Sequence, residues 1–127
     1  MTMNLRVSAY YSNGVKMTMN ATKAQEILRS VSYENGFHFF SPDGHHTGET
    51  ATTLCFFLKD LSHVGIESVR FHFCRGDFQK WLRTTIGDQE LANEIDNIAA
   101  NISDQDLLTE LPKLIEKRIV YLKSYTP

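Results

Sequence analysis

The histidines and cysteines of this 127-residue chain are the side chains best suited to bind a metal ion. Imidazole and thiolate are common ligands of zinc and iron. Their spacing shows neither a C-x-x-C nor an H-x-x-x-H pattern. We therefore predict no cofactor, and keep as an alternative a zinc or iron site in a metal-dependent enzyme or metal sensor. The histidines of that alternative are His38, His45, His46 and His72.

Two pairs of these residues are poorly placed to share one ion. Neighbouring His45 and His46 point to opposite sides of an extended chain. His72 and Cys74 share a face only in a strand, because they lie about 200° apart around a helix. Residues 68–74 alternate as a strand does, but they also fit an amphipathic helix. Helix and strand both stay open for this segment.

Other catalytic chemistry has little support. His72 lies between two phenylalanines, and a general base would need a partner carboxylate and a pocket. The nearest acid, Asp77, is expected to cap the helix that follows it, and Cys55 is expected in the core. No G-x-S-x-G motif occurs, and residues 44–49 lack the spacing and the lysine of a phosphate-binding loop. The sequence therefore favours a protein without catalytic activity.

Charge is segregated along the chain. Residues 88–111 contain seven acids and no base, whereas residues 70–83 contain four bases and one acid, Asp77. The two segments either face each other across the fold, form a binding surface, or are simply solvated helix faces. The four bases, which we call the basic ridge, are Arg70, Arg75, Lys80 and Arg83.

Nucleic acid is a further class of partner to consider. A surface on which bases stack is expected either at residues 37, 39 and 40, which are phenylalanines, or at Trp81 with the basic ridge. Trp81 also shares a helical stripe with Phe78 and Ile86. We predict that Trp81 is buried in the core. A formal charge of −2 argues against binding to duplex DNA. An RNA- or ribosome-associated factor remains a further alternative.

Apolar periodicity predicts mainly helices. Amphipathic stretches follow Thr22 and Ser103, and glycine–aspartate pairs at 76–77 and 87–88 interrupt and restart helices. Residues 37–40 read as a short extended segment that ends at a Ser-Pro-Asp-Gly turn. The expected fold is α+β, predominantly helical, with a small N-terminal β-hairpin followed by five or six short helices in a single domain, residues 1–127. The expected inward stripe of the last helix is Leu108, Leu111, Ile115, Ile119 and Leu122.

The N-terminal segment has an internal repeat. Residues 1–4 recur as residues 17–20, either by coincidence or because residues 1–16 are an extension that precedes a native start at Met17 or Met19. If these residues form the hairpin, a three-residue loop at 12–14 pairs Ala9 with Met17 and matches apolar side chains. We predict that register rather than the two-residue Asn13-Gly14 turn.

One pattern carries a resemblance. Residues 71–82, FHFCRGDFQKWL, and residues 87–92, GDQELA, together resemble an uncharacterised family of prokaryotic, largely archaeal domains with the pattern FH..RGDF..W....GD.ELA. The similarity covers roughly residues 35–95. It implies a small, mainly helical domain that stands alone or is joined to other domains. The resemblance implies no activity and therefore no catalytic residue.

These observations favour a non-catalytic protein-interaction or regulatory module with a protein partner or self-association. Two cysteines and no leader-like segment suggest the cytoplasm, and no apolar run reaches the roughly 18 residues of a membrane span. The expected contact surface combines a polar loop at 43–50 with the basic ridge. Its residues are Asp43, His45, His46, Thr47, Glu49, Arg70, Arg75, Lys80 and Arg83.

Overall fold

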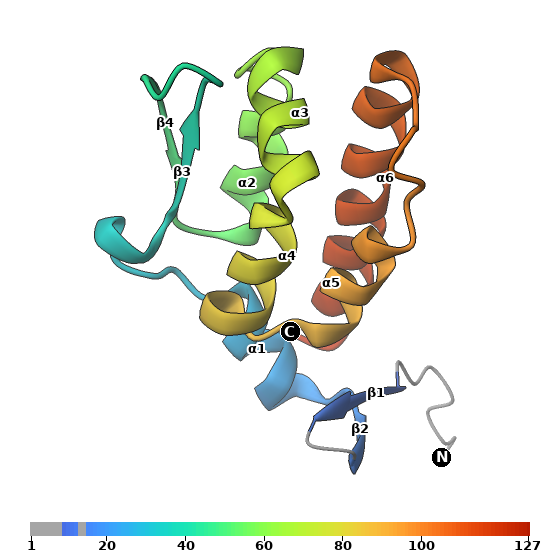
Figure 1. The fold of residues 1–127 in the computed structure, drawn as a ribbon. Helices are drawn as coiled ribbons and strands as arrows, with labels where there is room; N and C mark the ends of the chain where they lie inside the picture. Colours follow the sequence, from blue (N-terminus) through green and yellow to red (C-terminus); the bar gives the residue numbers. More distant parts are fainter. Residues whose placement is uncertain (1–8, 13–14) are drawn as a thin grey trace.

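The computed structural model describes residues 9–12 and 15–127, and it confirms an α+β, mainly helical fold with an N-terminal β-hairpin (Figure 1). Helices α2, α3 and α4 stand beside α5 and α6, while the hairpin of β3 and β4 lies on the flank away from α6. The elements are β1 (Ala9–Ser12), β2 (Val15–Thr18), α1 (Ala21–Leu28), η1 (Tyr33–Asn35), β3 (Phe37–Phe40), β4 (His46–Ala51), α2 (Leu54–Leu61), α3 (Ile66–Arg75), α4 (Asp77–Trp81), the π-helical η2 (Leu82–Ile86), α5 (Gln89–Asp96) and α6 (Asp104–Lys123).

The register predicted for the N-terminal hairpin is wrong. Ala9 pairs with Thr18 and Ser12 pairs with Val15, which leaves two residues between the strands. The predicted pairing of Ala9 with Met17 relied on matching apolar side chains. A two-residue Asn-Gly connection instead suits the right-handed twist of paired strands, and this local preference outweighs the apolar match. Residues 1–8, which contain the first copy of the repeat, lie outside the described residues, and the extension over residues 1–16 stays a prediction.

The segment predicted as a polar loop contains a strand. Gly44 N–H donates to Ser41 O at 2.9 Å, which confirms the turn at 41–44, and β4 then pairs antiparallel with β3. Half of β4 is exposed and only its last residue is buried, so its sequence, His-Thr-Gly-Glu-Thr-Ala, lacks the apolar alternation that signals a half-buried strand. β4 therefore forms a strand because its backbone pairs with β3, and its side chains give no sign of this.

Residues 68–74 are helical, because they lie within α3. The helix ends at Gly76, whose φ of 74° is in the left-handed region that glycine adopts readily. His72 is therefore buried, while Cys74 two residues later is exposed. The glycine–aspartate pairs break the chain as predicted, since Gly87 also has a positive φ and Asp88 caps α5.

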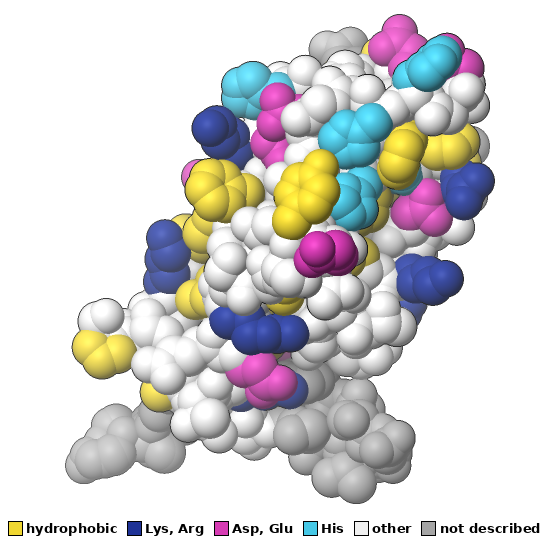
Figure 2. Space-filling model, turned by 90° about the vertical axis from the view of Figure 1, so that its left-hand side faces the viewer, with side chains coloured by type: hydrophobic (Ala, Val, Ile, Leu, Met, Phe, Trp, Pro, Cys, Tyr) yellow, Lys and Arg dark blue, Asp and Glu magenta, His cyan; other side chains and the backbone are white. Residues whose placement is uncertain are grey.

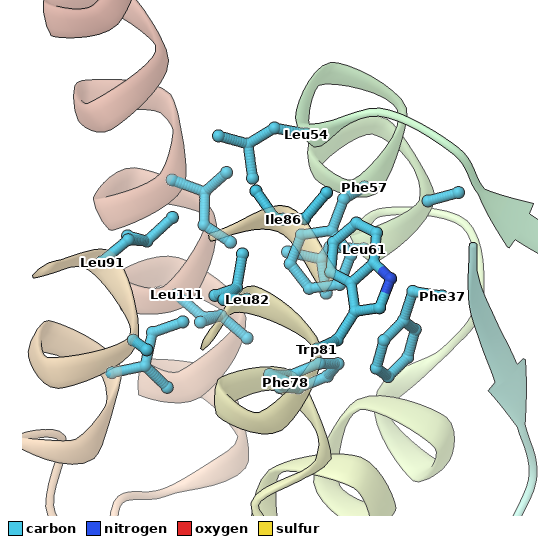
Figure 3. Close-up of a cluster of buried hydrophobic side chains, with 14 of the residues drawn as sticks. Phe37, Leu54, Phe57, Leu61, Phe78, Trp81, Leu82, Ile86, Leu91 and Leu111 are labelled. Atoms are coloured by element: carbon cyan, nitrogen blue, oxygen red, sulfur yellow. The ribbon is translucent and has the colours of Figure 1, made fainter. Parts of the chain in front are cut away.

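A single hydrophobic cluster joins all six α-helices and β3 (Figure 3). Trp81 is 7% exposed and packs beside Phe37 and Phe57, which confirms the prediction that it is buried. Two predictions about the core are wrong. Leu107 rather than Leu108 points inward from α6, because the stripe through Leu111 continues toward the N-terminus by a step of four residues instead of three. Cys55 is exposed on α2.

The π-helical turn η2 is fastened to α1. Arg29 donates to the carbonyls of Thr85 at 2.7 Å and Ile86 at 3.1 Å, which a regular helix end would leave to solvent. Gly87 and Asp88 both donate backbone N–H groups to Leu82 O, at 2.7 and 2.8 Å, and close the wide turn. Among the described residues, no helix combines the length and hydrophobicity needed to cross a lipid bilayer.

A buried ion pair fixes α5 against α6. Arg118 donates to both carboxylate oxygens of Asp88, at 2.8 and 2.9 Å, and the two side chains are 4% and 0% exposed. Asp88 Oδ1 also accepts the N–H of Leu91 at 3.1 Å, so one carboxylate caps α5 and holds α6.

Removing one partner of this pair is expected to destabilise the fold strongly. Arg118→Ala leaves the Asp88 carboxylate buried without its counter-charge, and we expect a loss of about 3–5 kcal/mol in the free energy of unfolding. Arg83→Ala, which removes a more exposed pair with Asp96, is the matched control and should cost about 1 kcal/mol or less. Urea unfolding followed by circular dichroism measures both. Equal losses of unfolding free energy in the two variants would contradict the special role of the buried Arg118–Asp88 pair.

Candidate functional site

The candidate site is a groove beside β3. It has a volume of about 580 Å³ and lies between β3 on one side and α3, α4 and η2 on the other. Its lining is mostly apolar. The lining residues are Gly36, Phe37, His38, Phe40, Gly44, Phe71, His72, Arg75, Asp77, Lys80, Trp81, Thr84 and Thr85.

Four aromatic side chains form the apolar part of this groove. Phe37 and Trp81 are almost completely buried and belong to the core, with ring centroids 5.7 Å apart (Figure 3). Trp81 Nε1–H donates to Asn35 O at 2.9 Å, so the indole is fixed by η1. Phe40 and Phe71 are only partly buried and offer their rings to a ligand.

His72 joins the two walls of the groove. Its Nε2 accepts the backbone N–H of Phe40 at 2.9 Å, and its Nδ1 lies 2.8 Å from Asp77 Oδ2. Because a backbone N–H can only donate, Nε2 carries the lone pair and Nδ1 carries the proton that Asp77 accepts. Ser68 Oγ donates to Phe40 O at 2.8 Å, so α3 satisfies both backbone groups of this residue.

The imidazole of His72 is held in its neutral form. Burial lowers the pKa of His72 below its ordinary value, although the hydrogen bond and the charge of Asp77 act in the opposite direction. Asp77 was predicted to cap α4, and this is wrong: no side chain caps that helix. Its carboxylate instead accepts from His72 and from Arg75 Nε, the latter at 3.0 Å.

Two of the predicted site residues place positive charge on the rim of the groove. The Arg75 guanidinium lies 5.0 Å from the centroid of the Phe71 ring. Lys80 is exposed, one helical turn after Asp77. Within the described part of the chain, the Lys80 ammonium has no ion-pair partner.

The other two members of the basic ridge lie elsewhere and are paired. Arg70 donates to Asp104 Oδ1 at 2.7 and 3.0 Å and lines a separate cavity of about 420 Å³. Arg83 pairs with Asp96 and donates to Asn93 Oδ1 at 2.9 Å. Both acids belong to the acidic segment 88–111, so these two arginines serve to hold the fold together.

The hairpin histidines form a chain of hydrogen bonds on the exposed face of β3 and β4 (Figure 2). Gly48 N–H donates to His46 Nδ1 at 2.9 Å, which leaves His46 Nε2–H to donate to Thr50 Oγ1 at 3.0 Å. The Thr50 hydroxyl then donates to His38 Nδ1 at 2.9 Å. His38 alone among these three lines the groove.

The remaining residues of the predicted polar surface make local contacts. His45 Nδ1 lies 3.0 Å from Asp43 Oδ2, and Thr47 Oγ1 accepts Glu49 N–H at 3.3 Å. Hydrogen bonds, first from Ser41 and then from His45, lower the pKa of Asp43 to about 2.

Asp60 of α2 lies beside Glu49 of β4, and we call these two residues the carboxyl pair. Asp60 is 5% exposed. Burial, with a hydrogen bond to Glu49 and the charge of that residue, raises the pKa of Asp60 to about 6. The raised pKa means that the charged form of Asp60 is disfavoured at this buried position, which opposes folding at pH values above about 6.

The predicted metal ligands do not converge. His45 faces Asp43, His72 is bound to Phe40 and Asp77, and only His38 and His46 are neighbours, with ring centroids 5.8 Å apart. Within residues 9–12 and 15–127, no three His, Cys, Asp or Glu side chains are grouped to hold a metal ion.

Sequence reasoning missed several residues of the groove. Phe71 is missed because an aromatic residue beside a buried face reads as core, and Thr84 and Thr85 are missed because threonines in a helix carry no signal of their own. The spacing of His72 and Asp77 on either side of Gly76 is the one feature of the sequence that could have indicated their contact. A helix that ends at Gly76 and restarts at once returns the side chain of residue 77 toward the last turn of α3.

Comparison with protein families gives one match. A model of a family of unknown function (DUF5752) matches residues 13–118. No curated protein and no solved structure matches the chain.

Protonation of His72 is expected to weaken the fold. Because its pKa is lowered on folding, the unfolded chain binds the proton first, and stability falls as pH drops through the ordinary histidine value of about 6.5. His72→Gln removes this titration while keeping an acceptor and a donor. We expect its unfolding free energy to depend less on pH between about 7 and 5 than that of the unmodified chain. An unchanged pH profile in His72→Gln would refute the assignment.

For Asp60 we predict a pH dependence of stability opposite in sign to that of His72. Asp60 has a raised pKa, so the folded chain binds its proton first and stability rises as pH falls through about 6. Asp60→Asn removes the buried charge, and we expect it to stabilise the protein by about 1–3 kcal/mol at pH 8, with the gain lost by about pH 4. Urea unfolding at both pH values measures this, with the exposed Glu116→Gln as control. A gain independent of pH would contradict the raised pKa of Asp60.

Proposed function

We propose that this chain, which belongs to the family of unknown function DUF5752, is a non-catalytic protein-interaction module that binds an extended segment of a partner protein in the groove beside β3. The observation that carries the proposal is the groove itself. It is mostly apolar, has two cations on its rim, and is walled by elements that are fixed to one another through His72. Apolar centres with polar rims are typical of protein-binding surfaces.

The shape of the groove favours an extended segment. Its lining runs from Gly36, just before β3, to Gly44, in the turn after it. β3 has four residues, which span about 13 Å at the rise of a strand. A partner segment of roughly four extended residues therefore matches the length of the groove.

The hydrogen bonds of His72 support a binding role rather than a catalytic one. A general base needs a free lone pair within reach of a substrate, and Nε2 of His72 already accepts the N–H of Phe40. The other nitrogen donates to Asp77. Both ring nitrogens of the histidine–carboxylate pair in the groove are thus used in hydrogen bonds within the fold.

The alternatives have less support. A metal enzyme or sensor would need the hairpin histidines and His72 to approach one another, and a nucleic-acid surface would need an exposed indole beside free cations. Trp81 is buried, and Arg70 and Arg83 are paired.

Two exposed free thiols suit a reducing compartment, which supports the proposed cytoplasmic location.

Site-specific photo-crosslinking tests this function. A photoreactive phenylalanine analogue replaces the exposed groove residue Thr84 or, as control, the exposed Lys113 on α6, and the full chain is expressed in the cells from which the sequence comes. We expect a discrete protein adduct from position 84 that is absent from position 113 and is lost when Phe71→Ala is added. Adducts that are the same at both positions, or that are unaffected by Phe71→Ala, would refute the proposal.

A further inference from the structure

We infer that the partner segment is acidic, with a carboxylate that binds between Arg75 and Lys80 and a neighbouring apolar side chain that packs on Phe40 and Phe71. This inference rests on the proposed protein-binding function. It adds the chemistry of the partner, which the shape of the groove alone does not specify.

Arg75 is oriented to receive a carboxylate. Its Nε is used by Asp77 at 3.0 Å, and its guanidinium plane lies over Phe71. The side chain is 61% exposed, and among the described residues its two terminal nitrogens have no hydrogen-bond acceptor. These nitrogens form the fork that binds carboxylates through parallel hydrogen bonds. The contact with Asp77 thus restrains the arginine without using its binding edge.

Lys80 supplies a second positive charge at the same rim. It follows Asp77 by one turn of α4, and it lines the groove together with Arg75. The charged side chains of the lining, apart from the histidines, are these two cations and the carboxylate of Asp77. Asp77 is already engaged by His72 and Arg75, so the rim has a surplus of one positive charge. Such a surplus favours an acidic partner and disfavours a basic one.

The aromatic rings beside these cations define the apolar part of the partner. Phe37 and Trp81 are occupied by core contacts, whereas Phe40 and Phe71 are partly exposed. Because Arg75 lies against Phe71, an apolar side chain on that ring is adjacent to the carboxylate position. An aromatic or leucine residue next to an aspartate or glutamate fits this arrangement.

The second cavity offers a useful contrast. Like the groove it is lined by arginine and phenylalanine, but the arginine that lines only this cavity, Arg70, donates to Asp104 and to the carbonyl of Ile102 at 2.6 Å. No cation there is left for a ligand carboxylate except Arg75, which both cavities share. At the groove, by contrast, Lys80 has no ion-pair partner among the described residues, and it lies at the same rim as Arg75 and the partly exposed rings of Phe40 and Phe71.

Selection from a random heptapeptide library displayed on phage tests the inference on the full chain. We expect enriched peptides to carry an acidic residue next to an aromatic residue or leucine. Synthetic versions should change the fluorescence of Trp81, the only tryptophan, and should bind Lys80→Glu about tenfold more weakly. Lys113→Glu, an exposed charge reversal on α6, should bind them with unchanged affinity.

The outcomes separate this inference from the proposed function. Peptides that require Phe71 but show no acidic preference, and that bind Lys80→Glu with unchanged affinity, would overturn the inference and leave the protein-binding function intact. If no enriched peptide depends on Phe71, both fail. Acidic peptides that weaken equally in Lys80→Glu and Lys113→Glu would indicate general charge attraction and would also overturn the inference.

Discussion

The contact on which the groove depends is made by one neutral imidazole. His72 reaches from α3 to the peptide N–H of Phe40 in β3 and, through its other nitrogen, to Asp77 at the start of α4. These three elements are the walls of the groove, so the ring fixes the distance between them. A buried N–H without a partner costs about 1–3 kcal/mol. The hairpin of β3 and β4 therefore gains both its position and part of its stability from a side chain outside it.

The rest of the fold gives this contact a rigid support. Phe37, Phe57 and Trp81 pack behind the groove, and the Arg118–Asp88 pair holds α6 against α5 on the far side. Side chains that present charge from such a frame need little reordering when a partner binds. Arg75 gains further order from Asp77. The site thus combines a fixed aromatic wall with cations that are partly restrained.

Sequence reasoning succeeded where local signals decide the structure. Glycine at 76 and 87 and the apolar stripe through Trp81 marked helices that the structure contains. It failed where partners are distant or faces are exposed. The strand β4 has little apolar alternation, and the role of Asp77 depends on a ring in the preceding helix. The pairing of Arg70 with Asp104 joins residues 34 positions apart. Such contacts follow from the assembled fold, and no single stretch of sequence contains them.

The π-helical turn η2 makes the geometry of the site sensitive to chain length. Such a turn holds one residue more than an α-helical turn would, and here it carries Thr84 and Thr85 into the groove lining while Arg29 occupies its loosened carbonyls. Deleting a single residue between 82 and 86 would restore a regular helix and rotate the preceding and following side chains relative to each other by about 100°. Insertions and deletions at this turn would therefore redirect the groove more severely than most substitutions within it.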